Sequence, residues 1–577
     1  MKMLEESMLC KECPNAPKDP VKRRSSIFFM FESIIEATDH SEGKPSEDIY
    51  LEGRLKDKVK FTGGVTDEEI LKLLENCSGF HKLVHSIGVS VRGLKDTTGK
   101  INFQLKNLGK GKKYETGTLL EISCPKDGTE VIFKLEDYKW SAEDDILSKF
   151  AFEFDKAGEL AIATIKFYLN DGYEVPEIAM ETPVSFDSEE YESMIKKSLL
   201  NKGNNKRLKI AIEKAERGED VTIAYIGGSI TQGAAAKPIN TNCYPYKAYL
   251  RFKDMFGKEA GENIHFVKAG VGGTPSELGI IRYERDILRD KAVEPDIVIV
   301  EFAVNDEGDE TKGICYESLC LKILSGKNKP AVILLFAVFM NDWNLQDRLS
   351  QVGKHYNLPM VSIKDAVVEQ FLLTKAEGNI ISKRQFFYDI YHPTNDGHRV
   401  MADCLGYLFS ETRKSIEDKD DIITDKTPVI GNCFKDIHIL DRKNYKDVVT
   451  ITEGSFTQTD TDLQMVEMDD NAFLSPEFPF NWMYTTSSRK ESFRMIIKCS
   501  SLILVFKDSG SSTFGTADIF VDGKRAKTAD PHENNWTHCN PVILFQNEEC
   551  EEHTVEIKMA LDNEDKCFTI LGFGYTL

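Results

Sequence analysis

The stretch Val221–Gly233, VTIAYIGGSITQG, decides the fold. Its first six residues are apolar except for Thr222, a pattern typical of a strand that is buried on both faces of a parallel sheet. Gly227 and Gly228 then end the strand, because two adjacent glycines allow the backbone to turn sharply. We therefore expect Ser229 at the carboxyl end of the strand, where open α/β sheets bind ligands. A hydroxyl presented there is suited to be a covalent nucleophile.

Three other interpretations of these glycines fail on the residues that each motif requires. A phosphate-binding loop needs Lys and Ser or Thr at the positions of Ala234 and Ala235. A dinucleotide fingerprint needs a different order of glycines, and the serine elbow of the α/β-hydrolases needs glycine at the position of Thr231. A structural turn with an unreactive serine stays open from this stretch alone, so the rest of the chain has to decide.

Length, charge and cysteine content narrow the class of protein. A chain of 577 residues is longer than one hydrophobic core usually supports, so several domains are expected. The net charge of -21 is spread along the chain, which disfavours nucleic acid and anionic membranes as partners. No stretch is long and apolar enough to span a membrane, and the amino terminus does not resemble a secretory signal. The 13 cysteines lack a framework spacing, so we expect reduced thiols and a cytoplasmic location.

The domain borders follow from changes in the hydrophobic pattern. Short alternating runs, interrupted by one helix near 67–76, indicate an N-terminal β-sandwich. In the middle of the chain, buried strands alternate with helices, which implies a doubly wound parallel sheet. The pattern then returns to β structure, with Asp522 and Gly523 as a tight hairpin turn. The expected segments are a disordered or irregular terminus (1–25), a β-sandwich (26–176), a connector (177–205), an α/β domain (206–412), a linker (413–428) and a C-terminal β-sandwich (429–577) that binds carbohydrate or covers the site.

Polar residues follow successive strands of the α/β domain and are expected at one edge of its sheet. Ser229 follows the first strand, and the glycines Gly270–Gly273 follow the second. Asn305 follows the third strand, and Asp389 and His392 lie in a loop after the fifth. A hydroxyl, a glycine loop, an amide, a carboxylate and an imidazole are the parts that acyl transfer needs.

Each of these residues has a physical task in acyl transfer. His392 can accept the proton of Ser229 and return it to the leaving alcohol, because an imidazole has a pKa of about 6.5. Asp389 can accept a hydrogen bond from the other ring nitrogen and so fix the tautomer. The developing oxyanion needs donors, which the N–H groups of Ser229 and Gly273 and the amide of Asn305 can supply. No metal and no cofactor is required, and the lone Cys10 and Cys13 pair is a poor candidate for a metal site.

The blocks GGSITQG, GVGG, VND and DIYHP resemble, in this order, the four motif blocks of the SGNH or GDSL hydrolase family. The resemblance covers about Lys206 to Thr412. It implies a flavodoxin-like α/β/α fold and a metal-free serine esterase mechanism. By motif position it also implies Ser229, Asp389 and His392 as the catalytic triad, with Gly273 and Asn305 as oxyanion donors.

Two positions depart from the family pattern. Neither carries the reaction, so they bear on which subfamily the domain resembles and not on whether it is active. Gly228 replaces the acidic residue that commonly precedes the serine, and Lys268 stands where an asparagine often opens the second block. The GGSIT form is similar to bacterial carbohydrate esterases in which the SGNH domain is joined to β-sandwich modules. The fold class expected is therefore multidomain, with a central flavodoxin-like α/β/α sheet flanked by N-terminal and C-terminal jelly-roll-like β-sandwiches.

Four further residues have a structural and a functional interpretation. His398 could compete as the base, but a capping or packing role is favoured because it begins the last helix of the α/β domain. Asp306 is expected to order its own loop through backbone hydrogen bonds. Trp536, in the polar loop DPHENNWTHCNP, offers a face on which a sugar could stack, and a Trp anchored in its own domain is an equal alternative. Trp482 has surroundings that indicate packing.

The resemblance to carbohydrate esterases thus implies an esterase that removes O-acetyl groups from plant-polysaccharide fragments of the xylan or mannan type, as an acetyl xylan esterase does in hemicellulose degradation. Two alternatives stay open: a lipase or thioesterase for longer acyl chains, and an inactive carbohydrate-binding protein on an esterase scaffold. The expected partner is an acetylated oligosaccharide, without nucleic acid or membrane. A homo-oligomer is left open.

Overall fold

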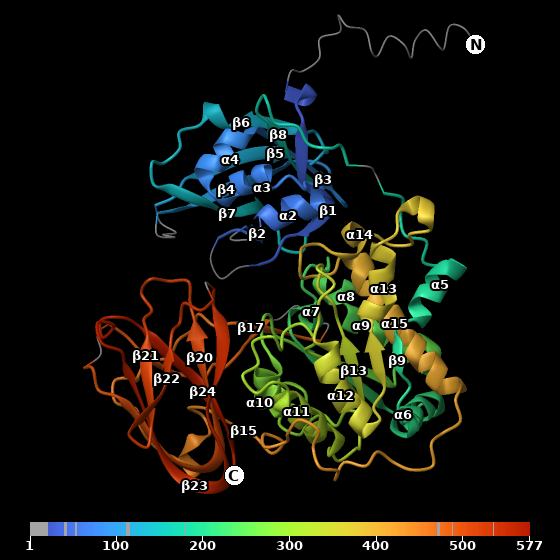
Figure 1. The fold of residues 1–577 in the computed structure, drawn as a ribbon, viewed down its shortest axis with the longest axis vertical. Helices are drawn as coiled ribbons and strands as arrows, with labels where there is room; N and C mark the ends of the chain where they lie inside the picture. The colour runs from blue at the N-terminus through green and yellow to red at the C-terminus, as the bar shows by residue number, and fades with distance from the viewer. Residues whose placement is uncertain are drawn as a thin grey trace, which may run out of the picture. The chain divides into compact units, whose positions relative to one another are not determined.

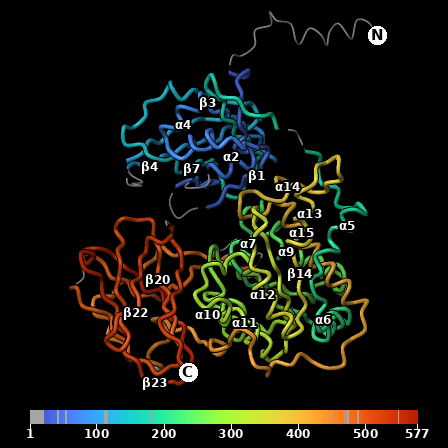
Figure 2. Tube along the Cα trace, in the orientation of Figure 1, coloured from blue at the N-terminus to red at the C-terminus, as the bar shows by residue number. Residues whose placement is uncertain are grey.

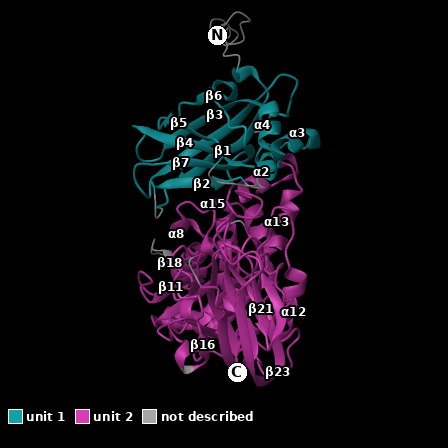
Figure 3. Cartoon of the chain, turned by 90° about the vertical axis from the view of Figure 1, so that its left-hand side faces the viewer, with its two compact units in different colours: residues 1–183 teal, residues 184–577 magenta. Residues whose placement is uncertain are grey.

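The computed structural model describes residues 21–39, 43–51, 55–110, 116–178, 181–469, 474–486, 489–534 and 536–577 (Figures 1 and 2). The chain divides into two compact units, Met1–Pro183 and Val184–Leu577 (Figure 3). Cys10, Cys13 and most of the terminus expected to be disordered lie outside the described residues. The short 3₁₀ helix η2 (Val21–Arg23) occupies part of that expected segment.

The first unit contains two four-stranded antiparallel sheets among its described residues. Their strand orders are β1-β8-β3-β6 and β2-β7-β4-β5. The sheets face each other across an aromatic core, in which the ring of Phe29 on β1 lies 5.1 Å from that of Phe150 on β7. The strands are β1 (Ser26–Glu36), β2 (Ser46–Tyr50), β3 (Val84–Gly93), β4 (Lys100–Gly109), β5 (Leu119–Pro125), β6 (Val131–Lys134), β7 (Asp144–Glu153) and β8 (Leu160–Leu169).

The helix expected near 67–76 is present as α3 and η3, which together cover residues 68–75, but further short helices precede and follow it. Asp67 caps one helix by accepting from the N–H groups of Glu69 and Ile70. Asn76, at the end of the expected helix, is extended and caps the next helix by accepting from the N–H of Gly79 at 2.8 Å. Capping side chains thus mark the start of the expected helix at Asp67 and the start of the next helix at Asn76. The helices of this unit are α2 (Leu55–Thr62), α3 (Glu68–Lys72), η3 (Leu73–Glu75), α4 (Cys77–Leu83) and η4 (Leu135–Asp137).

The second unit is built around a mixed sheet with the strand order β18-β17-β11-β10-β12-β13-β14-β9. The five strands from β11 to β14 in this order are parallel, which is the flavodoxin-like arrangement. The strands are β9 (Leu199–Asn201), β10 (Val221–Gly227), β11 (Ile264–Gly270), β12 (Ile297–Glu301), β13 (Ala331–Phe336), β14 (Met360–Ser362), β17 (Met465–Met468) and β18 (Leu474–Pro476).

Helices cover both faces of this sheet, because its central strands are apolar on both sides. On β10, Ala224 and Ile226 belong to the core cluster that includes α10 and α11, whereas Tyr225 contacts the ring of Tyr244 on α9. Gly218 ends α6, with a φ of 84°. The helices are α5 (Glu189–Lys196), α6 (Lys206–Arg217), α7 (Ser229–Gln232), α8 (Ile239–Asn242), α9 (Tyr244–Phe256), α10 (Ser276–Asp286), α11 (Ile314–Leu324), α12 (Gln346–Tyr356), α13 (Ile363–Phe371), η5 (Lys375–Glu377), α14 (Lys383–Phe386) and α15 (Asn395–Lys414).

Both edges of the sheet are completed by segments that the sequence pattern places elsewhere. β9 lies in the expected connector and pairs antiparallel with β14. β17 and β18 lie in the expected C-terminal β-sandwich, yet β17 pairs antiparallel with β11. Edge strands of a parallel sheet leave backbone groups unpaired, and an added strand satisfies them. The hydrophobic pattern of a short strand does not reveal its partner, so these pairings could not be predicted.

The remaining C-terminal strands form one hydrogen-bonded sheet rather than the two sheets expected. The long strands β20 and β23 run through it and join the order β15-β24-β20-β23-β21-β22, while β16 pairs with β20 and β19 pairs with β24. Asp522 and Gly523 both have positive φ, of 51° and 76°, as a tight hairpin turn requires. The elements are β15 (His438–Leu440), η6 (Tyr445–Asp447), β16 (Thr450–Thr452), β19 (Trp482–Tyr484), β20 (Phe493–Asp508), β21 (Ala517–Val521), β22 (Lys524–Ala529), β23 (His538–Met559) and β24 (Phe568–Thr576).

The C-terminal sheet shares a hydrophobic core with the central α/β domain. Alternate residues of β20 face opposite sides, so that Leu504 lies in the C-terminal core and Ile503 and Val505 lie in the core of the α/β domain. On β24, a Cβ atom at Gly574 would lie 2.7 Å from Ile281 of α10. The C-terminal sheet therefore packs directly on α10, which explains why the two domains form a single compact unit.

Candidate active site

Ser229 is the first residue of α7, the short helix that follows β10. The buried Lys268 on β11 supports this helix, because its Nζ donates to the backbone oxygen of Gln232 at 3.0 Å. A cation beside the last carbonyls of a helix is favourable. The lysine that departs from the family pattern thus holds the helix that carries Ser229.

Ser229, His392 and Asp389 form a continuous chain of hydrogen bonds. The Nε2 atom of His392 lies 3.0 Å from Ser229 Oγ, and its Nδ1 lies 2.9 Å from Asp389 Oδ2. The other oxygen of Asp389 accepts the backbone N–H groups of Tyr391 and His392, both at 2.7 Å. The turn therefore fixes the carboxylate, the carboxylate orients the imidazole, and the imidazole faces the hydroxyl. This arrangement can make a serine nucleophilic.

Asn305 follows β12 and packs against the backbone before Ser229. A Cβ atom at Gly228 would lie 2.2 Å from Asn305 Oδ1, which is closer than any real contact. Any larger residue at position 228 would displace the Asn305 amide. The position of the Asn305 amide therefore depends on glycine at position 228.

Gly273 meets residues of the C-terminal region. It has a φ of 71°, and a Cβ atom there would lie 3.0 Å from Cζ2 of Trp536 and 3.4 Å from Nε2 of His538. The ring of Trp536 therefore packs on the glycine loop next to Ser229, and 45% of the residue stays exposed. Trp482, by contrast, is fully buried in the C-terminal core, as its surroundings indicated. The structure thus brings one of the two tryptophans to the rim of the site.

A cluster of aromatic rings beside His392 was missed by the sequence reasoning. The ring of Tyr391 lies 6.0 Å from that of His392 and 5.0 Å from that of Phe339, and the ring of Phe339 stacks on that of Trp343 at 5.9 Å. A hydrogen bond of 3.1 Å from Met340 N to the oxygen of Ile390 joins the two loops. The aromatic residues in FMNDW, after the fourth strand, were the only feature of the sequence that could have indicated this cluster.

His398 is a structural residue. It is fully buried, its Nδ1 accepts the N–H of Tyr244 at 3.2 Å, and its Nε2 lies 3.2 Å from the oxygen of Ala234. Burial lowers the pKa of His398 to about 3. The imidazole is therefore neutral and fully engaged, and it does not compete with His392 as a base.

The backbone N–H of Asp306 donates to the oxygen of Phe302 at 3.0 Å within its own loop, as expected, but its carboxyl bonds to another element. Its two carboxyl oxygens accept the N–H of Ser276 at 2.7 Å and the hydroxyl of Ser276 at 2.8 Å. Ser276 begins α10, where backbone N–H groups lack partners within the helix. The carboxyl thus ties the loop of Asn305 to α10, a long-range contact that local turn chemistry does not predict.

A buried carboxyl lies beneath α7. Glu301 ends β12, and its Oε2 accepts from the hydroxyl of Thr231 at 3.2 Å, which lies 2.8 Å from the hydroxyl of Tyr244. Burial raises the pKa of Glu301 from 4.5 to about 8. The carboxyl is therefore protonated at neutral pH, and α7 rests on an uncharged hydrogen-bond network.

The raised pKa of Glu301 predicts a pH-dependent stability. The folded protein binds this proton more tightly than the unfolded chain, so the stabilisation is complete below pH 4.5 and is lost as the pH rises through about 8. Glu301→Gln keeps the shape and removes the titration. From about pH 6 to about pH 9, the Tm of the variant should rise by several degrees relative to the wild type. Thermal unfolding checks this, and a Tm difference that does not change with pH would contradict it.

In the described part of the chain, no group of three or more His, Cys, Asp or Glu side chains is placed to hold a metal ion. A helix with the length and hydropathy needed to cross a membrane is also absent from the described residues.

The parallel sheet and the Ser-His-Asp chain at its carboxyl edge define an α/β domain of the serine hydrolase class. Residues 225–400 match the model of the GDSL-like Lipase/Acylhydrolase family. The chain therefore carries an SGNH/GDSL hydrolase domain, which confirms the resemblance found in the sequence motifs.

Two solved structures share more of the architecture. One is a crystal structure of a two-domain esterase (CEX) active on acetylated mannans, 26% identical with a TM-score of 0.56, covering 66% of this chain and 98% of that chain. The other is such an esterase co-crystallized with mannopentaose, 26% identical with a TM-score of 0.55, covering 66% of this chain and 97% of that chain. A comparison with curated proteins gave no match. Together with the hydrolase domain, the similarity supports a carbohydrate esterase.

Proposed function

We propose that this protein is a serine esterase that removes O-acetyl groups from plant-polysaccharide oligosaccharides in the cytoplasm. Fragments of the mannan type are the favoured substrate, and fragments of the xylan type are the alternative. The hydrogen-bond chain from Ser229 through His392 to Asp389 carries the proposal. The similarity to an esterase active on acetylated mannans supports the sugar preference.

The reaction proceeds through an acyl-enzyme. His392 Nε2 takes the proton from Ser229 Oγ as this oxygen attacks the acetyl carbonyl, and Asp389 stabilises the imidazolium. The tetrahedral intermediate collapses with cleavage of the bond to the sugar oxygen, which takes the proton from His392 and leaves as the alcohol. Water then attacks the acetyl-serine by the same route and releases acetate. The N–H groups of Ser229 and Gly273 and the amide of Asn305 stabilise the oxyanion in both steps.

Aromatic side chains on two sides of the site support a carbohydrate as the alcohol part of the ester. Trp536 packs on Gly273, and Phe339, Trp343 and Tyr391 form a cluster beside His392. Flat aromatic faces combine apolar contact with a polar edge and suit the faces of sugar rings. The sugar is therefore proposed to contact Trp536 while its acetyl group reaches Ser229.

The variant Trp536→Ala should distinguish a role in binding the sugar from a role in hydrolysing the ester bond. We expect kcat/KM for an acetylated manno-oligosaccharide to fall by about 10-fold, mostly through KM, since the stacking surface is lost. Hydrolysis of 4-nitrophenyl acetate, which has no sugar, should change far less. Steady-state kinetics with both substrates check this, and Trp536→Phe is the control that keeps a flat ring. Equal losses on both substrates would contradict a role in sugar binding.

The proposed activity is tested with a panel of substrates. Mass spectrometry of acetylated manno- and xylo-oligosaccharides, before and after treatment, should show the loss of acetyl groups from the manno-oligosaccharides first. Acetyl esters should be hydrolysed faster than octanoyl esters, and the reverse order would favour a lipase or thioesterase. A serine-directed organophosphonate should label Ser229, and an unlabelled, inactive protein would favour a carbohydrate-binding protein on an esterase scaffold.

A further inference from the structure

The glycine loop that follows β11 is held by a side chain from the C-terminal region. The Nε2 atom of Gln464 donates to the backbone oxygen of Gly272 at 2.7 Å. The other end of the same amide, Oε1, accepts the N–H of Cys539 at 2.8 Å. Gln464 is nearly fully buried, with 8% of the residue exposed. Both ends of its amide are therefore engaged, which fixes the direction in which it donates.

The carbonyl that accepts this hydrogen bond belongs to the peptide group of the proposed oxyanion donor. A peptide group joins the oxygen of one residue to the N–H of the next, so the oxygen of Gly272 and the N–H of Gly273 share one resonance system. A hydrogen bond to the oxygen draws electron density from the nitrogen and makes the N–H a stronger donor. Gln464 therefore acts on the N–H of Gly273 through one rigid group.

A second contact holds the following peptide group. The Nε2 atom of His538 lies 3.3 Å from the oxygen of Gly273, and its Nδ1 lies 2.9 Å from Asp508 Oδ2. Only 6% of the His538 side chain and none of the Asp508 side chain is exposed. The peptide groups on both sides of Gly273 are thus fixed by buried side chains from beyond the α/β domain.

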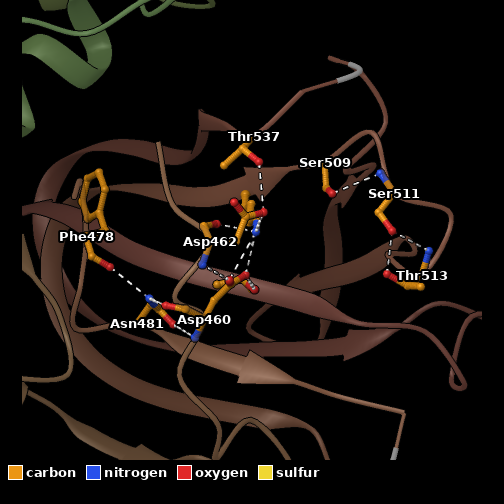
Figure 4. Close-up of polar contacts among 10 residues, drawn as sticks. Asp460, Asp462, Phe478, Asn481, Ser509, Ser511, Thr513 and Thr537 are labelled. Carbon is orange, nitrogen blue, oxygen red and sulfur yellow. Dashed lines mark hydrogen bonds and ion pairs between the residues drawn. The ribbon is translucent and has the colours of Figure 1, made fainter. Parts of the chain in front are cut away.

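The segment that carries Gln464 is anchored on both sides. After Gln464, the strand β17 pairs with β11 through the partners Met468 and Ala269. Before it, the buried Lys507 binds the carboxylates of Asp460 and Asp462, both at 3.0 Å. Figure 4 shows the side chains of Asp460 and Asp462 close together within this network. The backbone that carries Gln464 is therefore held in place where its side chain contacts the glycine loop.

We infer that Gln464 is a positioning residue for catalysis: it aims and polarises the N–H of Gly273 toward the oxyanion. The C-terminal region thus completes the esterase site rather than serving only as an appended module. This inference rests on the proposed function, because it needs an oxyanion to form at Ser229.

The variant Gln464→Met removes the donor while keeping a side chain of similar length. We expect kcat for 4-nitrophenyl acetate to fall by about 10-fold, less than the roughly 100- to 1,000-fold seen when a direct donor is lost, with KM nearly unchanged. Gln370→Met is the matched control. Gln370 on α13 is also buried, with 7% exposed, and its Oε1 accepts the N–H of Ile380 at 2.9 Å. This control should keep the wild-type kcat even if its Tm falls.

A second variant and a second measurement separate the donor from general packing. Gln464→Glu keeps an oxygen for the N–H of Cys539 but places an acceptor against the oxygen of Gly272, so kcat should fall at least as far. It also tests the donor if the Met variant does not fold. A trifluoromethyl ketone forms a tetrahedral oxyanion on the serine, and its inhibition constant should rise in proportion to the loss of kcat/KM.

Two kinds of result would overturn the inference or its basis, and they are distinguishable. If both Gln464 variants keep kcat within about twofold of the wild type while Ser229→Ala is inactive, the role of Gln464 is wrong and the esterase assignment stands. Equal losses of kcat in Gln464→Met and Gln370→Met would also contradict the inference, because they would show that the loss comes from disturbed packing and not from the missing donor. If Ser229→Ala is as active as the wild type, the proposed function itself is wrong.

Discussion

The variant Ser229→Ala is expected to lose roughly 10⁴- to 10⁶-fold in kcat for 4-nitrophenyl acetate and for acetylated oligosaccharides. Alanine removes the oxygen that lies 3.0 Å from His392 Nε2, so no acyl-enzyme can form. The remaining oxyanion donors still bind the substrate, so KM should change much less than kcat. Steady-state and burst kinetics check both expectations.

The fold of the Ser229→Ala variant should be unchanged, because the backbone of α7 is held by Lys268 and not by the serine hydroxyl. Thermal unfolding should give a Tm close to that of the wild type. Ser318→Ala is a suitable control, since Ser318 is a fully buried serine on α11 outside the site and should keep full activity when replaced. Substantial activity in Ser229→Ala would remove Ser229 from the mechanism.

The variant Asp389→Asn should lower kcat by about 10⁴-fold. The oxygen of the new amide can still accept the N–H groups of Tyr391 and His392, so the loop keeps its shape. Its nitrogen, however, is a donor where His392 Nδ1 needs an acceptor. The imidazole then carries its proton on Nε2, which faces Ser229, and cannot take another proton from the hydroxyl.

Asp396→Asn is the matched control for this second variant, because Asp396 lies in the first turn of α15 a few residues further along. The control should keep a kcat close to that of the wild type. A structure of Asp389→Asn should show His392 in place, with the new amide donating to its Nδ1 instead of accepting from it. If Asp389→Asn retained more than about a tenth of the wild-type kcat, the carboxylate would not be needed to fix the tautomer.

Local sequence patterns were enough to predict which side chains meet at the carboxyl edge of the sheet. The buried run ending at Gly227 specifies a strand, and the turn at Gly228 places Ser229 at the sheet edge. The order of the later blocks correctly placed Asp389 and His392 in one loop, where the structure brings both within hydrogen-bond distance of their partners. Such predictions succeed because strand pattern and turn chemistry are properties of short segments, and because strand-helix-strand connections follow a general rule that brings the carboxyl ends of the strands to one edge.

Contacts between distant segments could not be predicted in the same way. Asp306 was expected to bond locally, yet its carboxyl reaches Ser276 on another element. The C-terminal β-sandwich was expected to be a separate domain, yet β17 from that segment completes the central sheet, and Gln464 beside it reaches Gly272. A single glutamine in a polar stretch gives no periodic pattern that would indicate a function. Its role depends on which backbone carbonyl its amide contacts in the folded protein.

The sequence by itself determined the class of the central fold, the position of the serine and the set of groups available for acyl transfer, because these depend on hydrophobic period and on residue type. Only the tertiary structure decided that Trp536, His538 and Gln464 belong to the surroundings of that serine. The physical reason is that the C-terminal sheet buries part of β20 against the α/β core. This burial brings side chains more than 200 residues from the serine to its glycine loop.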